Sequence, residues 1–370
     1  MKITNVEALW LALPEISARP DSSQDALLIK ITTDAGIVGW GEVDSCPSVV
    51  KAIIEAPMSH SQVIGLRALL IGEDPLDTTR LWEKMHASTL YYGRAGAVIQ
   101  AMAGVDIALW DIKGKAFNMP VVTLLGGALR ERMRVYSSNL FQETVEKTVE
   151  RAKRAIDDGH TGVKFGWPPF GLDEAADLRY VEGVRRAIGE RNDFMLDVGQ
   201  AWDAKTTIRR AQLFAPYRLF WIEEPLRPED YVGYGRVSAA TSQHIAAGEQ
   251  QCTVSEYQRL IDEGGIDIVQ IDITRVGLTQ AMQIAAYAHV KGRKVCNHNF
   301  TTDFNSAASL HFLCAIPNAL VMEYCVEPSE LTSSLARNPV RIVDGYAHLP
   351  EEAGIGVVPN EEIVAKYLVK

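Results

Sequence analysis

Three segments, FMLDVGQ (194–200), LFWIEEP (219–225) and HIAAGEQ (244–250), each place an acidic residue at the end of an apolar run. The acids are Asp197, Glu223 and Glu249, and a constant interval of 26 residues separates them. One strand, one helix and two short loops take about that many residues in a parallel barrel of eight units and roughly 250 residues. We therefore expect the three carboxylates at the same end of three adjacent parallel strands.

The same alternation continues through the middle of the chain and predicts a barrel. Helical patterns separate apolar, strand-like runs, giving eight strands and about seven helices. An open, doubly wound sheet is the main rival, but it would need a GxGxxG turn after its first strand, and none follows residues 134–138. The predicted strands are 134–138, 162–165, 194–198, 219–223, 245–248, 268–271, 294–297 and 320–324, and the named helices are 144–158, 173–188, 206–214, 253–263 and 278–290.

The two ends of the chain differ from this repeat. Strand-like runs at 2–13, 26–33 and 37–43 precede helical runs at 77–88 and 95–117, an order typical of an α+β unit. From Val326 onward the repeat stops and prolines become frequent, so we expect the tail to pack back on the first unit. The predicted divisions are 1–125, 126–325 and 326–370.

Composition narrows the classes of partner. The formal net charge of −10 argues against nucleic acid or an anionic membrane, although a bound divalent metal would still allow an anionic small substrate. The five cysteines form no CxxC pair, which fits thiols in a reducing compartment. The N-terminal residues lack the apolar core of a signal peptide, and no run of about 18 apolar residues predicts a membrane span. We expect a cytoplasmic protein.

Seven successive predicted strands end in an ionisable residue. Active sites of such barrels form at the carboxyl ends of the strands. Burying a ring of charges without a metal and a substrate is costly, which favours a functional site over a structural one. Three carboxylates suit Mg²⁺, which prefers oxygen ligands. The ring comprises Lys164, Asp197, Glu223, Glu249, Asp272, His298 and Glu323.

The chemistry of this ring favours removal of a proton from the carbon next to a carboxylate. Lys164 and His298 flank the three acids on the two sides, and Asp272 ends the strand beside His298. A carboxylate bonded to one ring nitrogen fixes the tautomer and raises the basicity of the other nitrogen. Glu323 is a candidate donor of a proton or hydrogen bond. A metal-bound substrate carboxylate would stabilise the enediolate, so no protein nucleophile is needed.

With these residues in view, the sequence resembles the enolase superfamily, mandelate racemase subgroup, over essentially its whole length. The motifs that carry the resemblance are GIVGWGE (36–42), AMAGVDIALWDIKGKAFNMPVVTLLGG (101–127), WIEEP (221–225), AAGEQ (246–250), QIDITRVG (270–277) and MEY (322–324), together with Asp197 and His298. The resemblance implies a (β/α)7β barrel of the TIM type under an N-terminal α+β capping domain that the C-terminal tail completes.

The resemblance also implies roles for individual residues. It makes Asp197, Glu223 and Glu249 the Mg²⁺ ligands, Asp272–His298 a catalytic dyad and Glu323 the electrophile beside the substrate carboxylate. Lys164 aligns with the second, basic lysine of the family's Lys-x-Lys motif. The partner would be a small carboxylate substrate, and relatives assemble as dimers to octamers.

Two departures from the family pattern shape the predicted reaction. Gly162 replaces the first lysine of Lys-x-Lys, so Lys164 lacks the neighbour that would lower its pKa. Gly199 stands where many relatives have asparagine. Racemisation needs a base on each face, so the pattern favours dehydration of an aldonate or aldarate to a 2-keto-3-deoxy acid. His298 is the leading candidate for the base, the acid, or both.

Other interpretations of the protein's function stay open at this point. A racemase, epimerase or cycloisomerase of the same superfamily is the alternative, and a non-catalytic binding protein is a further one. A metal-dependent hydrolase would need a His-x-His motif on the first barrel strand, where the sequence reads RVYSSN. Candidate substrate contacts, each weighed against ordinary loop exposure or packing, are Arg19, Tyr92, Arg94 and Trp167.

Overall fold

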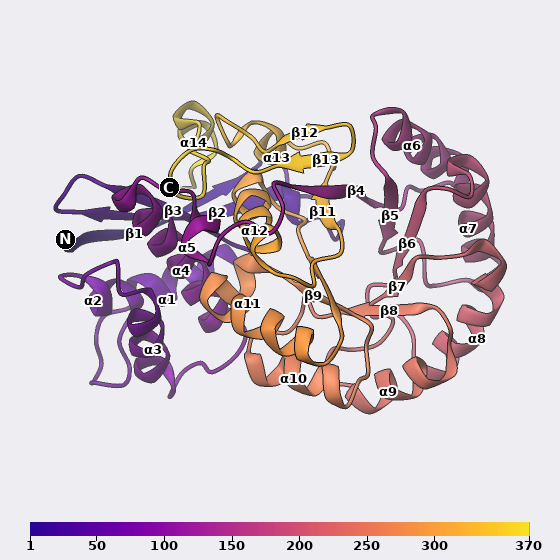
Figure 1. Cartoon of the computed structure of the whole chain (residues 1–370), viewed down its shortest axis with the longest axis horizontal. Helices are drawn as coiled ribbons and strands as arrows, with labels where there is room; N and C mark the ends of the chain where they lie inside the picture. Colours follow the sequence, from indigo (N-terminus) through magenta and orange to yellow (C-terminus); the bar gives the residue numbers. More distant parts are fainter. Residues whose placement is uncertain (370) are drawn as a thin grey trace.

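The computed structural model describes residues 1–369 and begins with a three-stranded antiparallel sheet. Its strands are β1 (Ile3–Ala12), β2 (Asp25–Thr33) and β3 (Val38–Val43), in that order. Apolar side chains on one face of the sheet form a core with the helices that follow. Those helices are α1 (Pro47–Glu55), α2 (Leu66–Leu70), α3 (Thr78–Thr89) and α4 (Ala97–Phe117). This N-terminal cap lies at one end of the molecule (Figure 1).

Two glycines of β3 let helix α4 lie directly on the sheet. A Cβ atom at Gly41 would stand 2.1 Å from the carbonyl oxygen of Gly104, and one at Gly39 would stand 2.2 Å from that of Ala108. Real Cβ atoms do not come this close to backbone, so any larger residue would push the helix away. The alternating glycines of the VGWG segment therefore fix the spacing between sheet and helix.

Eight parallel strands form the barrel. They pair in chain order from the first to the seventh, and the eighth pairs with the first. On the seventh strand, Val295 accepts the N–H of Leu320 and donates its own N–H to the carbonyl of Asn318, so the segment that leads into the eighth strand closes the ring. The strands are β4 (Arg132–Leu140), β5 (Gly162–Gly166), β6 (Asp193–Asp197), β7 (Trp221–Glu223), β8 (His244–Ala247), β9 (Ile268–Ile271), β10 (Lys294–Asn297) and β11 (Met322–Cys325). The predicted fold class is confirmed.

Seven helices connect the eight strands and surround the barrel (Figure 1). Several begin at side chains that cap their first turn, such as Thr144, Asp173 and Thr253, which is why their starts were predictable. The helices are α6 (Val145–Asp157), α7 (Glu174–Ile188), α8 (Ala204–Phe214), α9 (Tyr231–Ala240), α10 (Val254–Asp262), α11 (Ile273–Val290) and α12 (Asp303–Ala315).

Several predicted boundaries differ from the observed ones, and that of helix α11 differs most. Helix α11 begins at Ile273 and not at 278, because a first turn capped by Asp272 precedes a kink at Gly277, whose φ is +73°. Only glycine adopts that conformation readily, so the helical pattern resumes after it. Strand β7 begins at Trp221 and not at 219.

The C-terminal tail contacts both the barrel and the cap. A hairpin of β12 (Arg341–Val343) and β13 (Tyr346–His348) joins the barrel sheet, where β13 pairs antiparallel with β4. The tail also contains α13 (Glu330–Ser334) and α14 (Glu361–Tyr367), and the N–H of Val369 then donates to Trp10 on β1. Among residues 1–369, no helix has the length and apolar character needed to cross a membrane.

A buried carboxyl group links cap and barrel. Glu42 on β3 accepts hydrogen bonds from the hydroxyl of Thr302 (2.9 Å) and the N–H of Asn305 (3.0 Å) at the start of α12. Burial raises the pKa of Glu42 from 4.5 to about 8, against the opposing effect of these bonds. The folded protein therefore holds a proton that the unfolded chain releases above pH 4.5.

This link predicts a pH-dependent stability. The contribution of Glu42 falls as the pH rises from about 4.5 to about 8, since the unfolded state binds fewer protons there. Glu42→Gln keeps the acceptor oxygen, so we expect it to increase the free energy of unfolding at pH 8 by at least about 1.4 kcal/mol, the value of one pKa unit. Urea unfolding at pH 5 and pH 8 measures the effect, with Glu15→Gln on the exposed loop as control. An unchanged pH slope would contradict the assignment.

Candidate active site

The three acids predicted as metal ligands lie together at the carboxyl ends of neighbouring strands. Asp197 and Glu223 are the last residues of β6 and β7 and pair in register. Glu249 lies two residues beyond the end of β8. One oxygen from each of the three carboxylates falls within 4.8 Å of the others, and all three residues are buried. The expected juxtaposition is present.

The electrostatics of this cluster fit a divalent cation. Burial raises the pKa of Asp197 well above 3.8, and the charge of Glu223 adds to the shift. Burial likewise raises the pKa of Glu223, although Lys164 opposes it. At Glu249 burial is outweighed by His298 and Arg275, and the pKa is lowered. Three buried carboxylates at this spacing are costly alone and match the oxygen donors that Mg²⁺ prefers.

Lys164 on β5 occupies the side of the cluster towards β11. Its Nζ pairs with Glu223 and lies 2.6 Å from Oε1 of Glu323. Burial alone would lower the pKa of this lysine, but the charges of Glu223 and Glu323 raise it well above 10.5. The ammonium is therefore held in its charged form between two carboxylates.

His298 lies on the opposite side and forms a pair with Asp272. Nδ1 of the imidazole is 2.7 Å from Oδ2 of Asp272, and Nε2 is 3.2 Å from Oε2 of Glu249. Asp272 is itself held by the N–H and hydroxyl of Thr274, at 2.7 and 2.6 Å. Burial would lower the pKa of His298, but Glu249 and the hydrogen bond with Asp272 raise it to about 10. One ring nitrogen is thus anchored and the other faces the carboxylate cluster.

Glu323 on β11 is fixed by bonds from the neighbouring strand. Its Oε2 accepts the N–H of Asn299 (2.9 Å), and its own N–H donates to Oδ1 of Asn297 (2.8 Å). Oε1 is the atom near Lys164. The carboxylate therefore lies beside Lys164 at the carboxyl end of the last barrel strand.

One cavity of about 310 Å³ joins these groups. Its lining includes Lys164, Asp197, Glu249 and His298 from the predicted ring. Further lining residues were not found by sequence reasoning, and they come from the end of the first barrel strand, from the segments after β8, β9 and β10, and from the cap loop between β1 and β2. They include Ser138, Gln250, Arg275, Phe300 and residues 20–22.

Arg275 was missed although it follows Asp272 by three residues. Its guanidinium lies 2.7 Å from Oδ2 of Asp44 at the end of the cap sheet and donates to the carbonyl of Glu249 at 2.9 Å. Nε is 3.8 Å from Oδ2 of Asp272. This partly buried arginine thus ties a cap residue to a predicted metal ligand and to the dyad. The one available sequence signal was a cation on the first turn after a strand end.

The four predicted substrate contacts fall in different places. Trp167 lines the cavity. Arg19 is 48% exposed and lies 3.9 Å from Oε2 of Glu327 in the tail. The hydroxyl of Tyr92 donates to the carbonyl of Ile64 at 2.8 Å, within the cap. Arg94 lines a different cavity, between the cap and α10. The structure brings only Trp167 of these four to the lining of the site.

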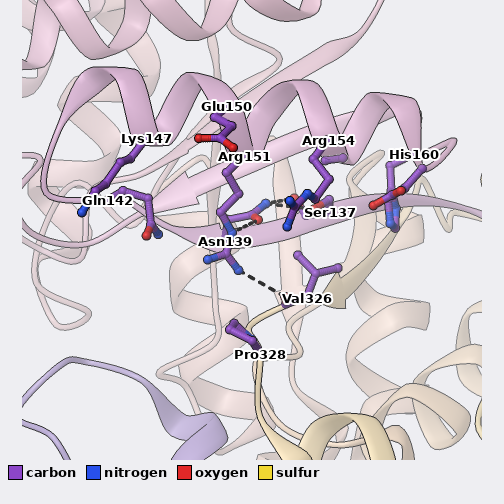
Figure 2. A pocket seen from close by; sticks show the side chains of 12 residues that line it. Ser137, Asn139, Gln142, Lys147, Glu150, Arg151, Arg154, His160, Val326 and Pro328 are labelled. Carbon is purple, nitrogen blue, oxygen red and sulfur yellow. Dashed lines mark hydrogen bonds between the residues drawn. The ribbon is translucent and has the colours of Figure 1, made fainter.

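A separate cavity of about 480 Å³ lies outside the barrel, along α6 (Figure 2). Arg151 crosses it, donating to Oδ1 of Asn139 (2.8 Å) and to the carbonyl of Val326 (3.1 Å). Asn139 lines both this cavity and the active-site cavity, so its side chain forms part of the wall between them.

Comparison with known proteins agrees with this geometry. Residues 3–126 match the family described as mandelate racemase / muconate lactonizing enzyme, N-terminal domain, and residues 147–363 match the family described as enolase C-terminal domain-like. The chain therefore belongs to the enolase superfamily, in its mandelate racemase/muconate lactonizing enzyme subgroup. It is an enzyme of a family that typically needs a divalent metal.

Individual relatives differ in their reactions. A D-galactonate dehydratase of Variovorax paradoxus is 32% identical over 91% of this chain and 89% of its own length. A D-galactarolactone cycloisomerase of Agrobacterium fabrum is 29% identical over 92% of this chain and 90% of its own. The crystal structure of a 3,6-anhydro-D-galactonate cycloisomerase from Zobellia galactanivorans superposes with a TM-score of 0.91 at 29% identity, covering 100% of both chains.

Proposed function

We propose that this protein is a Mg²⁺-dependent dehydratase of a sugar acid, converting an aldonate or aldarate to a 2-keto-3-deoxy acid. The observation that carries the proposal is one cavity lined by Asp197 and Glu249 of the three-acid cluster, with Lys164, paired with Glu223, on one side and His298, paired with Asp272, on the other. Several relatives of about 30% identity are named as acid-sugar dehydratases.

The metal would be held by Asp197, Glu223 and Glu249. When bound there, Mg²⁺ supplies positive charge that stabilises the negative charge developing on the substrate carboxylate as the neighbouring proton leaves. Lys164, held as an ammonium by Glu223 and Glu323, adds a second positive charge at the same end of the substrate. These groups orient the substrate carboxylate and acidify the adjacent C–H bond.

His298 performs the proton transfers in this proposal. Asp272 keeps the proton on Nδ1. A cation held by Glu249 and its two neighbours would offset the negative charge that raises the pKa of His298, and Nε2 would then be free to accept the proton from the α-carbon. The C–H electrons form a carbon–carbon double bond as the β C–O bond breaks. Nε2 returns its proton to the departing hydroxyl, which leaves as water. The resulting enol then tautomerises to the keto acid.

The main alternative is a cycloisomerase, because relatives of similar identity carry that name. It also begins with an acid–base step beside a carboxylate but opens or forms a ring. A racemase would need a second base on the opposite face, and Lys164 is the candidate there. Its pairing with two carboxylates makes it a poor proton acceptor, so racemisation ranks lower.

A substrate panel tests the proposal. Purified protein with Mg²⁺ is incubated with aldonic and aldaric acids of five and six carbons, and α-keto acid formation is measured. We expect turnover of at least one acid, and none after the metal is removed with EDTA. D-galactarolactone and 3,6-anhydro-D-galactonate are included as probes of cycloisomerisation.

The panel separates the alternatives. Ring opening of a lactone or anhydro acid without dehydration of any open-chain acid would favour a cycloisomerase. Solvent deuterium at the α-carbon without keto acid would favour a racemase. No reaction with any compound, together with normal Mg²⁺ binding, would refute the dehydratase proposal.

A further inference from the structure

The loop between β1 and β2 forms part of the wall of the active-site cavity. Pro20, Asp21 and Ser22 line the same cavity as Lys164 and His298. The hydroxyl of Ser22 donates to the carbonyl of Phe300 beyond β10 (3.0 Å), which ties the loop to the barrel.

A second bond fixes the other side of this loop. The hydroxyl of Ser329 in the tail donates to the carbonyl of Ser23 (2.7 Å). Asp21 is therefore held in place from both directions, at the cap end of the cavity.

The carboxylate of Asp21 can accept more hydrogen bonds than it receives from the protein. Its Oδ1 receives the N–H (3.0 Å) and the hydroxyl (2.6 Å) of Ser23, capping the short 3-10 helix η1 (Ser22–Gln24). Within residues 1–369, both hydrogen bonds that this carboxylate accepts end on Oδ1. The second oxygen, Oδ2, retains its lone pairs for a ligand in the cavity.

The two cationic side chains that line the cavity already form ion pairs with carboxylates of the protein. Lys164 pairs with Glu223 and Glu323, and Arg275 pairs with Asp44. A second carboxylate on the substrate, placed at the cap end, would therefore meet the negative charge of Asp21. A hydroxyl at the same place would instead donate a hydrogen bond to it.

We propose that the cavity selects polyhydroxy acids with one carboxylate over those with two, and that Asp21 is the residue that determines this specificity. The inference rests on the proposed function, since it assumes that the substrate carboxylate binds at the cluster of acids. It favours aldonates over aldarates. A volume of about 310 Å³ suits a small acid of this kind.

The substitution Asp21→Asn removes the negative charge of this residue without changing the conformation of the loop. Asparagine caps a helix about as well as aspartate and keeps the oxygen that receives the bonds of Ser23, so the loop conformation is retained. The matched control is Glu15→Gln, which removes an acid from the same loop at an exposed position outside the cavity lining.

The experiment compares acids that differ only at the far carbon. The pairs are D-gluconate with D-glucarate and D-galactonate with D-galactarate, each measured as kcat/KM at saturating Mg²⁺. We expect the unmodified enzyme to prefer the aldonate of the active pair. Asp21→Asn should reduce that preference by roughly 10- to 100-fold, the effect of removing one like charge at short range. The change should appear mainly as a lower KM for the aldarate, and Glu15→Gln should leave the ratio unchanged.

The outcomes distinguish this inference from the proposed function. If acids are dehydrated but the aldarate is preferred, or the ratio is unchanged in Asp21→Asn, the specificity role is wrong and the dehydratase assignment stands. If no acid is dehydrated, the assignment fails, and calorimetric titration of D-gluconate and D-glucarate with Mg²⁺ present decides the role of Asp21. Tighter gluconate binding that is lost in Asp21→Asn supports it. Equal affinity, or no binding of either, overturns it.

Discussion

His298→Asn should abolish turnover, lowering kcat by at least about 10³-fold, because one general acid–base group contributes 10² to 10⁴ and here it serves both proton transfers. Asparagine fits the space but takes up no proton at neutral pH. Asp272 keeps its bonds from Thr274, so its buried carboxylate is still satisfied and the fold should persist. The measurements are keto-acid formation, exchange of the α-proton with solvent, and circular dichroism.

The control for this variant is His289→Asn, an exposed histidine on α11. It should retain full activity. Residual activity of His298→Asn within about tenfold of the unmodified enzyme would transfer the role of base to another group. Loss of dehydration with α-proton exchange retained would limit His298 to protonating the departing hydroxyl.

Asp197→Asn should have opposite effects on the metal-free and metal-bound protein. Burial and the charge of Glu223 raise the pKa of Asp197 well above 3.8, so the ionised carboxylate destabilises the metal-free fold at pH 7. Replacing it with a neutral amide should therefore raise the free energy of unfolding of the metal-free protein at pH 7. Asparagine still accepts the N–H of Gly199, which binds Oδ1 at 2.8 Å. Stabilisation by Mg²⁺, about 2.7 kcal/mol at one hundred times Kd, should largely disappear.

Glu224→Gln provides the contrast for this measurement. Glu224 is the next residue after a predicted ligand, and burial also raises its pKa well above 4.5. It is not part of the three-carboxylate cluster. The glutamine variant should therefore stabilise the metal-free protein while keeping the response to Mg²⁺. Thermal unfolding with and without Mg²⁺ tests both variants, and an unchanged metal response in Asp197→Asn would exclude it as a ligand.

The barrel was predictable because its signal is repeated. Constant spacing between Asp197, Glu223 and Glu249 reflects a constant strand–helix unit, and the register of β6 with β7 follows from it. Helix α11 shows where such a signal fails. A glycine in the left-handed region breaks the apolar period at Gly277, so the turn before it reads as loop.

The centre of the site was predictable for the same reason, and its rim was not. Strand ends meet at one edge whatever their loops do, which brought Lys164 and His298 to one cavity. The position of Asp21 depends on contacts with Phe300 and Ser329, about three hundred residues away in sequence. Arg94 lines a different cavity, and the sequence of a loop cation gives no indication of which cavity it will line.

The cap is fastened to the barrel by buried carboxyl groups, including Glu42 at α12 and Asp106, which accepts the hydroxyl and N–H of Thr279 on α11. Moving the whole cap away from the barrel would leave these buried carboxyl groups without hydrogen-bond partners, so such a motion is too costly to occur in every catalytic cycle. Entry of the substrate and release of the product then depend on the short loop between β1 and β2. The neutral hydrogen bonds of Ser22 and Ser329 and the exposed ion pair of Arg19 with Glu327 tie this loop to the barrel and the tail. The cap domain would then stay fixed while this loop opens and closes. If loop opening limits turnover, kcat should fall as the viscosity of the solvent rises.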